Sequence, residues 1–273
     1  MALAAWPEFP HASAGPEAVT RGRVVCIIPA RMASTRFPGK PLAPILGLPM
    51  IEHVRRRVAL CPMLDAVIVA TCDEEIKKAV QKAGGHVIMT AATHERCTDR
   101  VAEAAAGLDA EVVINVQGDE PLILPTMMEE VVRPLFEDAT LPSANLVTRI
   151  EDDIEFRDPN APKVVTNRAG DLLYISREPI PSRQKASRDD YVKLKQLGVI
   201  AFRGDFLQAF ARLEPTPLEA VESVDMLRAV EHGYRVRAVE TKGRMIGVDV
   251  PSDIGRVERV LAADPLVEKY MTR

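Results

Sequence analysis

The most unusual chemistry in the sequence is a basic loop that directly follows an apolar segment. The run RVVCIIPA over residues 23–30 has the length and composition of a buried strand, and it leads into RMASTRFPGK with Arg31, Ser34, Arg36 and Lys40. Backbone N–H groups of a glycine-containing loop can approach phosphate oxygens, and cations offset the phosphate charge. The loop therefore predicts a polyphosphate site, although a solvated surface loop can have a similar composition. It contains neither GxxxxGK[ST] nor GxGxxG.

Carboxylates follow two other apolar segments. Asp119 and Glu120 come at the end of EVVINVQGDEP, and Asp249 lies in GVDVPSD just before a proline that can start a helix. Carboxylate oxygens are preferred ligands of Mg²⁺, which also keeps waters and phosphate oxygens. Each segment alone is explained as well by an acidic turn or a helix start. Together, Asp119 and Asp249 predict a magnesium site with two carboxylates.

A third polar segment, THERCTDR over residues 93–100, precedes a predicted helix. Arg100 in the first helical turn opposes the favoured sign of the helix dipole, which indicates a bound anion or an ion pair with Asp99. For His94, a hydrogen bond that stabilises the loop is a better explanation than general base catalysis.

The elements that must position these residues alternate between strand and helix. Continuous apolar strands interleaved with amphipathic helices predict a parallel sheet covered by helices on both faces. Ligands bind at the carboxyl ends of the strands in such a sheet. Strands are predicted at 23–30, 65–71, 86–90 and 111–119, and helices at 49–61, 73–84 and 98–108.

The pattern changes after about residue 140, where a mixed α/β lobe is predicted. It begins with a hairpin over 162–176 that turns at residues 168–170, followed by a polar segment over 178–196. Further strands are predicted at 197–204, 235–241 and 245–250, and further helices around 204–213, at 218–232 and from about Ser252.

Composition narrows the class of protein. The 273 residues carry a net charge of −4 with a pI near 5.8, which argues against nucleic acid as a partner. No apolar run approaches the roughly 20 residues of a membrane span, so no membrane insertion is expected. The four cysteines, at positions 26, 61, 72 and 97, form no CxxC pair. Free thiols are expected rather than disulfides or zinc, which favours the cytoplasm.

Seven segments, taken in order, strongly resemble the 3-deoxy-manno-octulosonate (Kdo) cytidylyltransferases, the CMP-Kdo synthetase family. The resemblance runs from about residue 23 to 260 through IIPARMASTRFPGKPL, VIVATCDEE, TDRVAEA, VINVQGDEPLI, YISREPIP, PLEAVESVDMLRAVEHGYRV and GVDVPSD. It implies a Rossmann-like three-layer α/β/α nucleotidyltransferase fold, similar to the GT-A fold, with a smaller mixed α/β lobe. It also implies an enzyme that transfers CMP from CTP to the anomeric hydroxyl of Kdo with Mg²⁺, for lipopolysaccharide or capsule synthesis.

The resemblance assigns roles to individual positions. Catalysis is assigned to Arg36, Lys40 and Asp119, and the metal to Asp119 and Asp249. Nucleotide binding is assigned to Pro29, Ala30, Arg31, Ser34, Arg36, Lys40, Ala70, Thr71, Asp73, Thr98 and Arg100. Sugar binding is assigned to Gln117, Glu120, Arg177, Gln196 and Glu222.

The resemblance also implies a domain plan. The Ala, Pro and Ser content of the N-terminal residues indicates a disordered or loose tail over 1–21, and one nucleotidyltransferase domain covers 22–262. That domain comprises a nucleotide-binding half at 22–140, a sugar-binding and dimerisation lobe at 141–245, and a returning strand and helix at 246–262. Residues 263–273 form a C-terminal tail. A homodimer is expected, and the polar segment 178–196 is either a loop over the sugar or part of the dimer face.

Departures from the family pattern cluster in two segments. HERCTDR replaces the family's HQSGTDR, which changes Glu95, Arg96 and Cys97, and QLGVI replaces HxGIY, which puts Gln196 and Ile200 in place of histidine and tyrosine. The acceptor is therefore Kdo, a modified Kdo or another ulosonic acid. A catalytically silent nucleotide-binding protein is a remote alternative.

Overall fold

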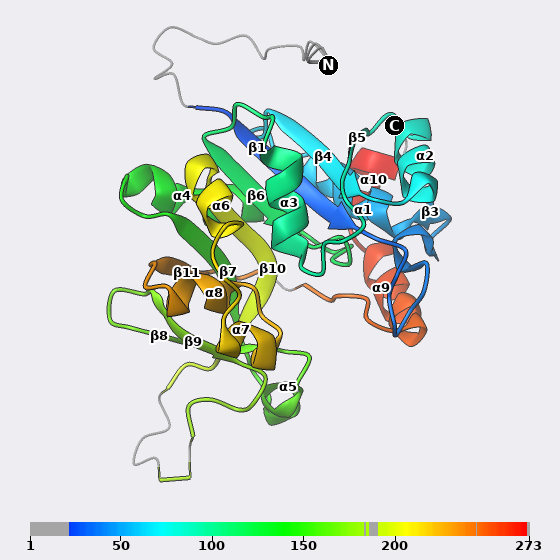
Figure 1. Cartoon of the computed structure of the whole chain (residues 1–273). Helices are drawn as coiled ribbons and strands as arrows, with labels where there is room; N and C mark the ends of the chain where they lie inside the picture. The colour runs from blue at the N-terminus through cyan, green and yellow to red at the C-terminus, as the bar shows by residue number, and fades with distance from the viewer. Residues whose placement is uncertain (1–21, 183, 186–190, 244, 272–273) are drawn as a thin grey trace, which may run out of the picture.

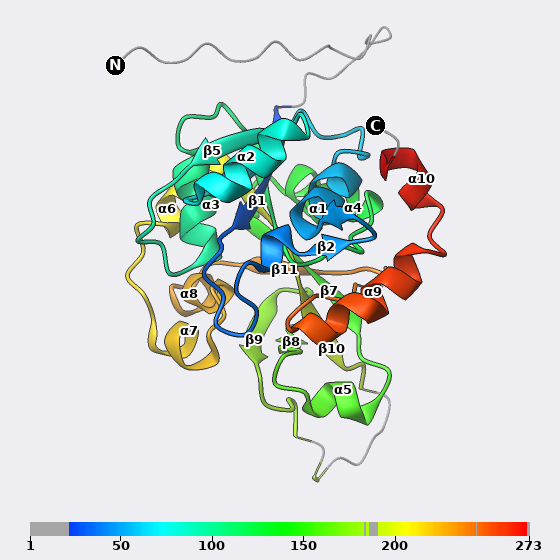
Figure 2. The same ribbon diagram turned by 90° about the vertical axis from the view of Figure 1, so that its right-hand side faces the viewer.

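A nine-stranded sheet forms the middle layer of the computed structural model, which describes residues 22–182, 184, 185, 191–243 and 245–271 (Figures 1 and 2). Seven strands lie in the order β11-β7-β10-β6-β1-β4-β5, and the β8–β9 hairpin joins the edge of β10. The bounds are β1 (Val24–Ala30), β4 (Ala66–Thr71), β5 (His86–Met89), β6 (Val112–Val116), β7 (Ser143–Arg149), β8 (Lys163–Thr166), β9 (Leu172–Ser176), β10 (Leu194–Arg203) and β11 (Val236–Glu240).

The first-half prediction of parallel strands is confirmed. β1 pairs in parallel with both β4 and β6, and β4 pairs in parallel with β5. β10 runs antiparallel to its three partners, β6, β7 and β8, and so separates this parallel half from β7 and β11. The carboxyl ends of β1, β4 and β6 therefore meet at one edge of the sheet, where the polar segments follow.

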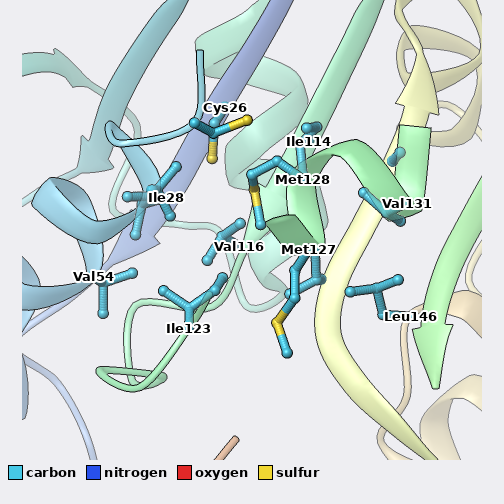
Figure 3. Packing of buried hydrophobic residues seen from close by; sticks show 14 of the residues in the cluster. Cys26, Ile28, Val54, Ile114, Val116, Ile123, Met127, Met128, Val131 and Leu146 are labelled. Carbon is cyan, nitrogen blue, oxygen red and sulfur yellow. The ribbon is translucent and has the colours of Figure 1, made fainter. Parts of the chain in front are cut away.

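Helices cover both faces of the sheet, as predicted. One face carries α1 (Met50–Val58), α2 (Glu74–Lys82) and α4 (Thr126–Glu137), and the other carries α3 (Cys97–Ala105), α6 (Gly204–Phe210) and α8 (Met226–Glu231). Successive residues of β1 alternate between the two cores, with Cys26 and Ile28 on the α1 side and Val25 and Ile27 on the α3 side. Figure 3 shows the α1-side core. Each such buried aliphatic side chain contributes about 1.5–3 kcal/mol.

The second-half lobe follows the predicted pattern with three differences: the helix predicted at 218–232 is divided, a short helix at 153–157 is additional, and the strand predicted at 245–250 is absent. The hairpin turns at Gly170, whose φ of 83° suits a residue without a Cβ. The predicted helix at 218–232 is two helices, α7 (Pro217–Glu222) and α8, because Ser223 adopts a left-handed φ of 53° between them. α5 (Asp153–Arg157) starts at Asp152, whose carboxylate accepts a hydrogen bond from the Glu155 amide at 2.7 Å.

The strand predicted at 245–250 is wrong. The described residues of this segment run as a loop, and the Val248 amide donates to the carbonyl of Asp119 at 3.0 Å. The apolar side chain of Val248 packs with Ile45, Met50 and Leu122. Its hydrophobicity therefore reflects burial beneath α9 (Ile254–Leu261) and α1 rather than a place in the sheet.

The C-terminal segment also differs from the expectation of a tail. After the short 3₁₀ turn η2 (Pro251–Asp253) and α9 (Ile254–Leu261), residues 266–271 form α10 (Leu266–Met271), which packs against α1. Tyr270 is buried, and its hydroxyl lies 2.8 Å from Nδ1 of His53. Arg57 of α1 forms an ion pair with Asp264 at 2.7 Å.

Several smaller expectations concern the covalent chain. Cys26, Cys61, Cys72 and Cys97 are all free thiols, as predicted. Within the described ranges, no helix is long and apolar enough to cross a membrane. The predicted tail 1–21 and part of the polar segment 178–196 lie outside the described residues. Short elements complete the fold: η1 (Lys40–Leu42), β2 (Pro44–Ile45) and β3 (Leu48–Pro49).

Candidate active site

The basic loop leaves the carboxyl end of β1 and is held in a fixed shape from below. The carboxylate of Asp73, at the end of β4, accepts a hydrogen bond from the Met32 amide at 2.8 Å. Gly39 closes the loop with a φ of 75° and donates its amide to the carbonyl of Met32 at 3.0 Å. The Ser34 hydroxyl accepts from the Phe37 amide at 3.3 Å. Arg31 and Arg36 are thereby presented to solvent at the sheet edge.

Lys40 connects the basic loop to both acidic segments. Its Nζ lies 2.7 Å from a carboxylate oxygen of Asp119 and donates to the carbonyl of Val248 at 2.8 Å. The Lys40 side chain is only 13% exposed, so solvent screens this contact weakly. Lys40 and Asp119, which the resemblance assigns to catalysis, are thus in direct contact.

Arg36 makes the corresponding connection to the second carboxylate. Its guanidinium lies 2.8 Å from a carboxylate oxygen of Asp249 and donates to the side chain of Asn160 at 2.9 Å. This pair is exposed, so its contribution to stability is small. The ion pair instead positions the Asp249 side chain, so that Asp249 lines the same cavity as Asp119.

The acidic loop approaches β1 closely because of Gly118. A Cβ at Gly118 would lie 2.9 Å from the carbonyl oxygen of Pro29, which is closer than real Cβ contacts. Glycine therefore lets the acidic loop lie directly beside the start of the basic loop.

Glu120 shows how much negative charge gathers here. Burial, together with the charges of Asp119 and Asp249, raises the pKa of Glu120 to about 8. A divalent cation would relieve this repulsion, and the oxygen donors of Asp119 and Asp249 suit Mg²⁺. The described part of the chain holds no metal-like cluster of three or more His, Cys, Asp or Glu side chains. A cation held by Asp119 and Asp249 would have to take its other ligands from phosphates and water.

Two connected cavities lie over the basic loop. A cavity of about 300 Å³ is lined by Pro29, Ala30, Arg31, Ala33, Ser34, Thr35, Arg36, Lys40, Pro41, Met50, Cys97, Gln117, Gly118 and Asp119. A smaller cavity of about 40 Å³ adjoins it beneath the 93–97 segment and is lined by Pro29, Ala30, Arg31, His94, Glu95, Arg96, Cys97 and Arg100. The cationic cavity suits a triphosphate, and the smaller one is narrow and largely apolar.

Arg100 extends into the smaller cavity with an unsatisfied donor. It is 3% exposed, one guanidinium nitrogen contacts the Thr90 hydroxyl, and Nη2 is buried without a hydrogen-bond partner among the described residues. Asp99 forms an ion pair with Arg228 at 2.9 Å. The ion pair between Asp99 and Arg100, one of the two explanations that the sequence offered for Arg100, is therefore absent. The remaining option is an anion or another acceptor that enters the cavity.

His94 has the structural role expected for it. Its ring contacts the carboxylate of Glu103, which also accepts a hydrogen bond from the Ala91 amide. Burial alone would raise the pKa of Glu103, but these two contacts outweigh burial and lower that pKa.

A third cavity, of about 380 Å³, extends from the basic loop to the second-half lobe. It is lined by Arg31, Arg36, Glu95, Arg96, Cys97, Gln117, Asp119, Glu120, Asn160, Pro162, Arg177, Gln196, Gly198, Ile200, Ser223, Val224, Asp225, Met226 and Asp249. The cavity thus joins both predicted metal carboxylates to four of the five predicted sugar residues. We call it the acceptor cavity below.

Arg177 and Glu222 hold each other in place. The Arg177 guanidinium donates to the carbonyls of Glu222, Pro159 and Ser223 at 2.6, 2.8 and 3.3 Å. The Glu222 carboxylate accepts from Tyr174, Ser176 and the Arg177 amide, and these bonds outweigh burial and lower the pKa of Glu222. Glu222 is absent from the lining of the acceptor cavity, so direct contact with a sugar stays a prediction.

Four predicted nucleotide residues line none of these three cavities. Ala70 and Thr71 are buried at the end of β4, and Asp73 supports the basic loop. Thr98 donates its amide and hydroxyl to the carboxylate of Asp225 at 3.2 and 2.8 Å, which anchors α3 to the second-half lobe. These contacts are structural, and direct nucleotide contact by the four residues stays a prediction.

Several lining residues escaped the sequence reasoning. Asn160 lines the acceptor cavity but lies in a segment without a distinctive pattern, 124 residues from its partner Arg36. The Val248 carbonyl belongs to the GVDVPSD segment, but its contact with Lys40, 208 residues away, could not be read from that segment. Cys97 drew attention only as a departure from the family pattern. Burial and the charges of Asp225 and Asp119 raise the pKa of the Cys97 thiol to about 12, so it stays protonated.

Comparison with known proteins agrees with this geometry. A sequence profile described as Cytidylyltransferase matches residues 25–240. The chain is 48% identical over 249 residues to the 3-deoxy-manno-octulosonate cytidylyltransferase of Geobacter metallireducens, covering 88% of this chain and 98% of that protein. The chain belongs to the 3-deoxy-manno-octulosonate cytidylyltransferase family. The relative of that name from Solibacter usitatus is 44% identical and matches 89% of this chain and 96% of its own length.

Solved structures place the fold in the same family. The structure of CMP:2-keto-3-deoxy-manno-octonic acid synthetase complexed with CTP superposes with a TM-score of 0.82 at 39% identity, covering 88% of this chain and 99% of that one. A cytidylyltransferase from Leptospira borgpetersenii has a TM-score of 0.62 at 16% identity, covering 89% of this chain and 88% of its own, which shows a shared fold. The predicted nucleotidyltransferase fold is therefore confirmed.

Proposed function

We propose that this chain transfers CMP from CTP to the anomeric hydroxyl of Kdo and releases pyrophosphate. The observation that carries the proposal is the acceptor cavity, where the cations of the basic loop and the carboxylates Asp119 and Asp249 face residues of the second-half lobe. The family relatives are named for this activity. The product is an activated acidic sugar of the kind used in lipopolysaccharide or capsule synthesis.

The residues divide the work of binding CTP. Arg31, Arg36 and Lys40 line the cavity that suits the triphosphate, and their charges offset those of the phosphate oxygens. Arg100 offers its unpartnered N–H to an acceptor atom of the cytosine ring in the smaller cavity. Pro29 and Ala30 form the apolar surface beside it.

The reaction needs positioning more than covalent catalysis. The anomeric oxygen forms a bond to the α-phosphorus while the bond from that phosphorus to the bridging oxygen of pyrophosphate breaks, and the hydroxyl proton passes to solvent. Lys40 and Arg36 neutralise charge on the departing pyrophosphate. Asp119 and Asp249 would hold Mg²⁺, which polarises the phosphate and favours a deprotonated nucleophile. The acceptor cavity holds the sugar in line.

The test is an assay of CMP-Kdo formation from CTP, Kdo and Mg²⁺, in which the released pyrophosphate is measured. We expect Asp119→Ala to abolish turnover and Asp109→Asn, an exposed acid of the α3–β6 loop, to leave turnover unchanged. Wild-type protein that binds CTP but releases no pyrophosphate with Kdo would overturn the assignment of the acceptor. Turnover in Asp119→Ala would overturn the role of the acidic loop.

A second acceptor is favoured by one specific observation. All five residues that depart from the family pattern, Glu95, Arg96, Cys97, Gln196 and Ile200, line the acceptor cavity. A cavity with altered residue types suits a modified Kdo or another ulosonic acid. Rates with Kdo and with a panel of acidic sugars separate the two: the proposal of a modified acceptor is rejected if Kdo has the highest kcat/KM.

We also propose that the protein is a cytoplasmic homodimer. Apolar side chains are exposed on the second-half lobe, with Leu173 of β9 at 56% and Val221 of α7 at 80%. Four free thiols suit a reducing compartment. Light scattering should give about twice 30.0 kDa, and Leu173→Glu should lower that mass. A mass of one chain for the wild type would exclude the dimer, and recovery outside the cytoplasmic fraction would exclude the compartment.

A further inference from the structure

β10 is interrupted where it passes the acceptor cavity. Gln196 pairs with Val147 of β7, whereas Ile200 pairs with Asn145, so β10 carries two more residues than β7 between these pairs. Such a bulge leaves backbone groups unpaired and redirects side chains. Here it turns both Gln196 and Gly198 toward the cavity.

Asn145 satisfies the bulge from the interior of the sheet. It is fully buried, and its Nδ2 lies within hydrogen-bond distance of the carbonyls of Leu197, Val199 and Leu146 at 2.9, 3.0 and 3.1 Å. Carbonyl oxygens only accept hydrogen bonds, so the nitrogen of the Asn145 amide must face them. The orientation of this amide is therefore fixed by its surroundings, and Oδ1 must point the other way.

The orientation of Asn145 determines that of Gln196. Oδ1 of Asn145 can only accept, and Nε2 of Gln196 donates to it at 2.6 Å. Oε1 of Gln196 then has no partner among the described residues, while Gln196 itself lines the acceptor cavity. This amide oxygen lies at the lining of the cavity, where it can accept a hydrogen bond from a donor group of a ligand.

The same bulge also places a second glutamine. The backbone N–H of Gln117 donates to the carbonyl of Gly198 at 2.8 Å. A Cβ at Gly198 would lie 2.4 Å from Cγ of Gln117, so glycine leaves the room that the Gln117 side chain occupies. Gln117 lines the acceptor cavity beside Asp119.

We propose that Asn145, which lines none of the cavities described here, is a positioning residue that makes Gln196 present its amide oxygen to a hydroxyl hydrogen of the acidic sugar. The proposal deepens the function proposed above and rests on it. A hydroxyl of the sugar is the group that is recognised at this position. The recognition depends on the side-chain amides of both Asn145 and Gln196 rather than on Gln196 alone.

A double-mutant cycle with Asn145→Ser and Gln196→Met tests the proposal. Gln196→Met should raise KM for Kdo about five- to tenfold and leave KM for CTP unchanged, because one hydrogen bond to the sugar is lost. Asn145→Ser should raise KM for Kdo similarly in the wild-type background but not in the Gln196→Met background. An equal rise in both backgrounds, or no rise in either single variant, would overturn the proposal.

Ser143→Ala is the matched control. Ser143 lies on the same strand, is fully buried, and donates its hydroxyl to the carbonyl of Ala201 in β10 at 2.9 Å. Its loss should lower the melting temperature without changing KM for Kdo. Asn145→Ser should also lower the melting temperature, but its effect on KM depends on Gln196.

A comparison that leaves Asn145 intact covers the case in which Asn145→Ser does not fold, or in which the wild type is inactive with Kdo. At pH 8 and without substrate, Gln196→Glu should melt below Gln196→Met, because the introduced carboxylate faces the Asn145 oxygen without a proton to donate. Equal or greater stability of Gln196→Glu would overturn the pairing. An inactive wild type with this difference intact would instead count against Kdo as the acceptor.

Discussion

Arg100 is the residue at which charge and burial conflict most directly. Its side chain is 3% exposed, yet Nη2 has no partner in the part of the chain that the structure describes. A buried donor without a partner costs about 1–3 kcal/mol. In the proposed function, CTP supplies the missing acceptor, so the cost is carried by the free protein and relieved in the complex.

The prediction at this scale is that Arg100→Met separates stability from binding. The free protein should keep or raise its melting temperature, because an unsatisfied charged group is removed from the interior. KM for CTP should rise about ten- to a hundredfold, as expected for a lost charge-assisted hydrogen bond. Calorimetry and initial rates measure the two effects, with Arg212→Met on the exposed surface as the control. An unchanged KM would contradict the assignment.

At the contact between α1 and α10, the hydrogen bonds of His53 define the protonation state of its imidazole. Nε2 of His53 lies 2.8 Å from the carbonyl of Ile45, which can only accept, so Nε2 carries the proton. Nδ1 then accepts from the Tyr270 hydroxyl. Burial, with the neighbouring charges of Arg57 and Arg56, lowers the pKa of His53 below its usual 6.5. The contact is thus built for neutral imidazole.

The prediction for these helices concerns acid stability. Because the pKa of His53 is lower in the folded than in the unfolded protein, the unfolded state binds more protons below about pH 6.5. Folding free energy is therefore lost as pH falls through that value. His53→Gln can replace both hydrogen bonds without titrating, so its melting temperature should fall less between pH 7 and 5. If the melting temperatures of the wild type and His53→Gln fell equally between pH 7 and 5, this role of His53 would be refuted.

The acidic loop has a different kind of constraint, because it depends on a close backbone approach. Gly118→Ala would place a Cβ 2.9 Å from the Pro29 carbonyl, and neither backbone can yield easily. We expect a loss of about 1–3 kcal/mol in unfolding free energy and a lower kcat, since Asp119 shifts with the loop. Gly107→Ala, where a Cβ meets nothing within 4 Å, is the control. A fully active, equally stable Gly118→Ala would show that the loop can move freely.

For the molecule as a whole, CTP should stabilise the folded protein, because it contacts segments that are distant in sequence. At a hundredfold excess over Kd, a ligand that binds only the folded protein adds about 2.7 kcal/mol of stability. We expect CTP with Mg²⁺ to raise the melting temperature more than CTP alone, and Asp249→Asn to remove that difference. Asp109→Asn should retain it. A Mg²⁺ effect that survives Asp249→Asn would place the cation elsewhere.

How far the sequence predicts this molecule depends on whether the signal is local. The strands and helices up to residue 119 follow from apolar periodicity, and Arg36, Lys40 and Asp119 from charge at strand ends. The loop at 245–250 did not, because burial against α9 and burial in a sheet give the same apolar pattern. Asn145 could not be recognised, since a buried asparagine gains its meaning from a bulge 51 residues away that only the folded chain reveals.

The contacts of Lys40 and Arg36 also set an order of events during synthesis. Lys40 is joined to Val248 and Arg36 to Asp249 across separations of 208 and 213 residues. A nascent chain on the ribosome can form the basic loop early, but it must extend past residue 249 before both carboxylates are present. Until then, in the proposed function, the basic loop can attract a nucleotide through its charge, but the chain lacks one of the two carboxylates that would hold Mg²⁺.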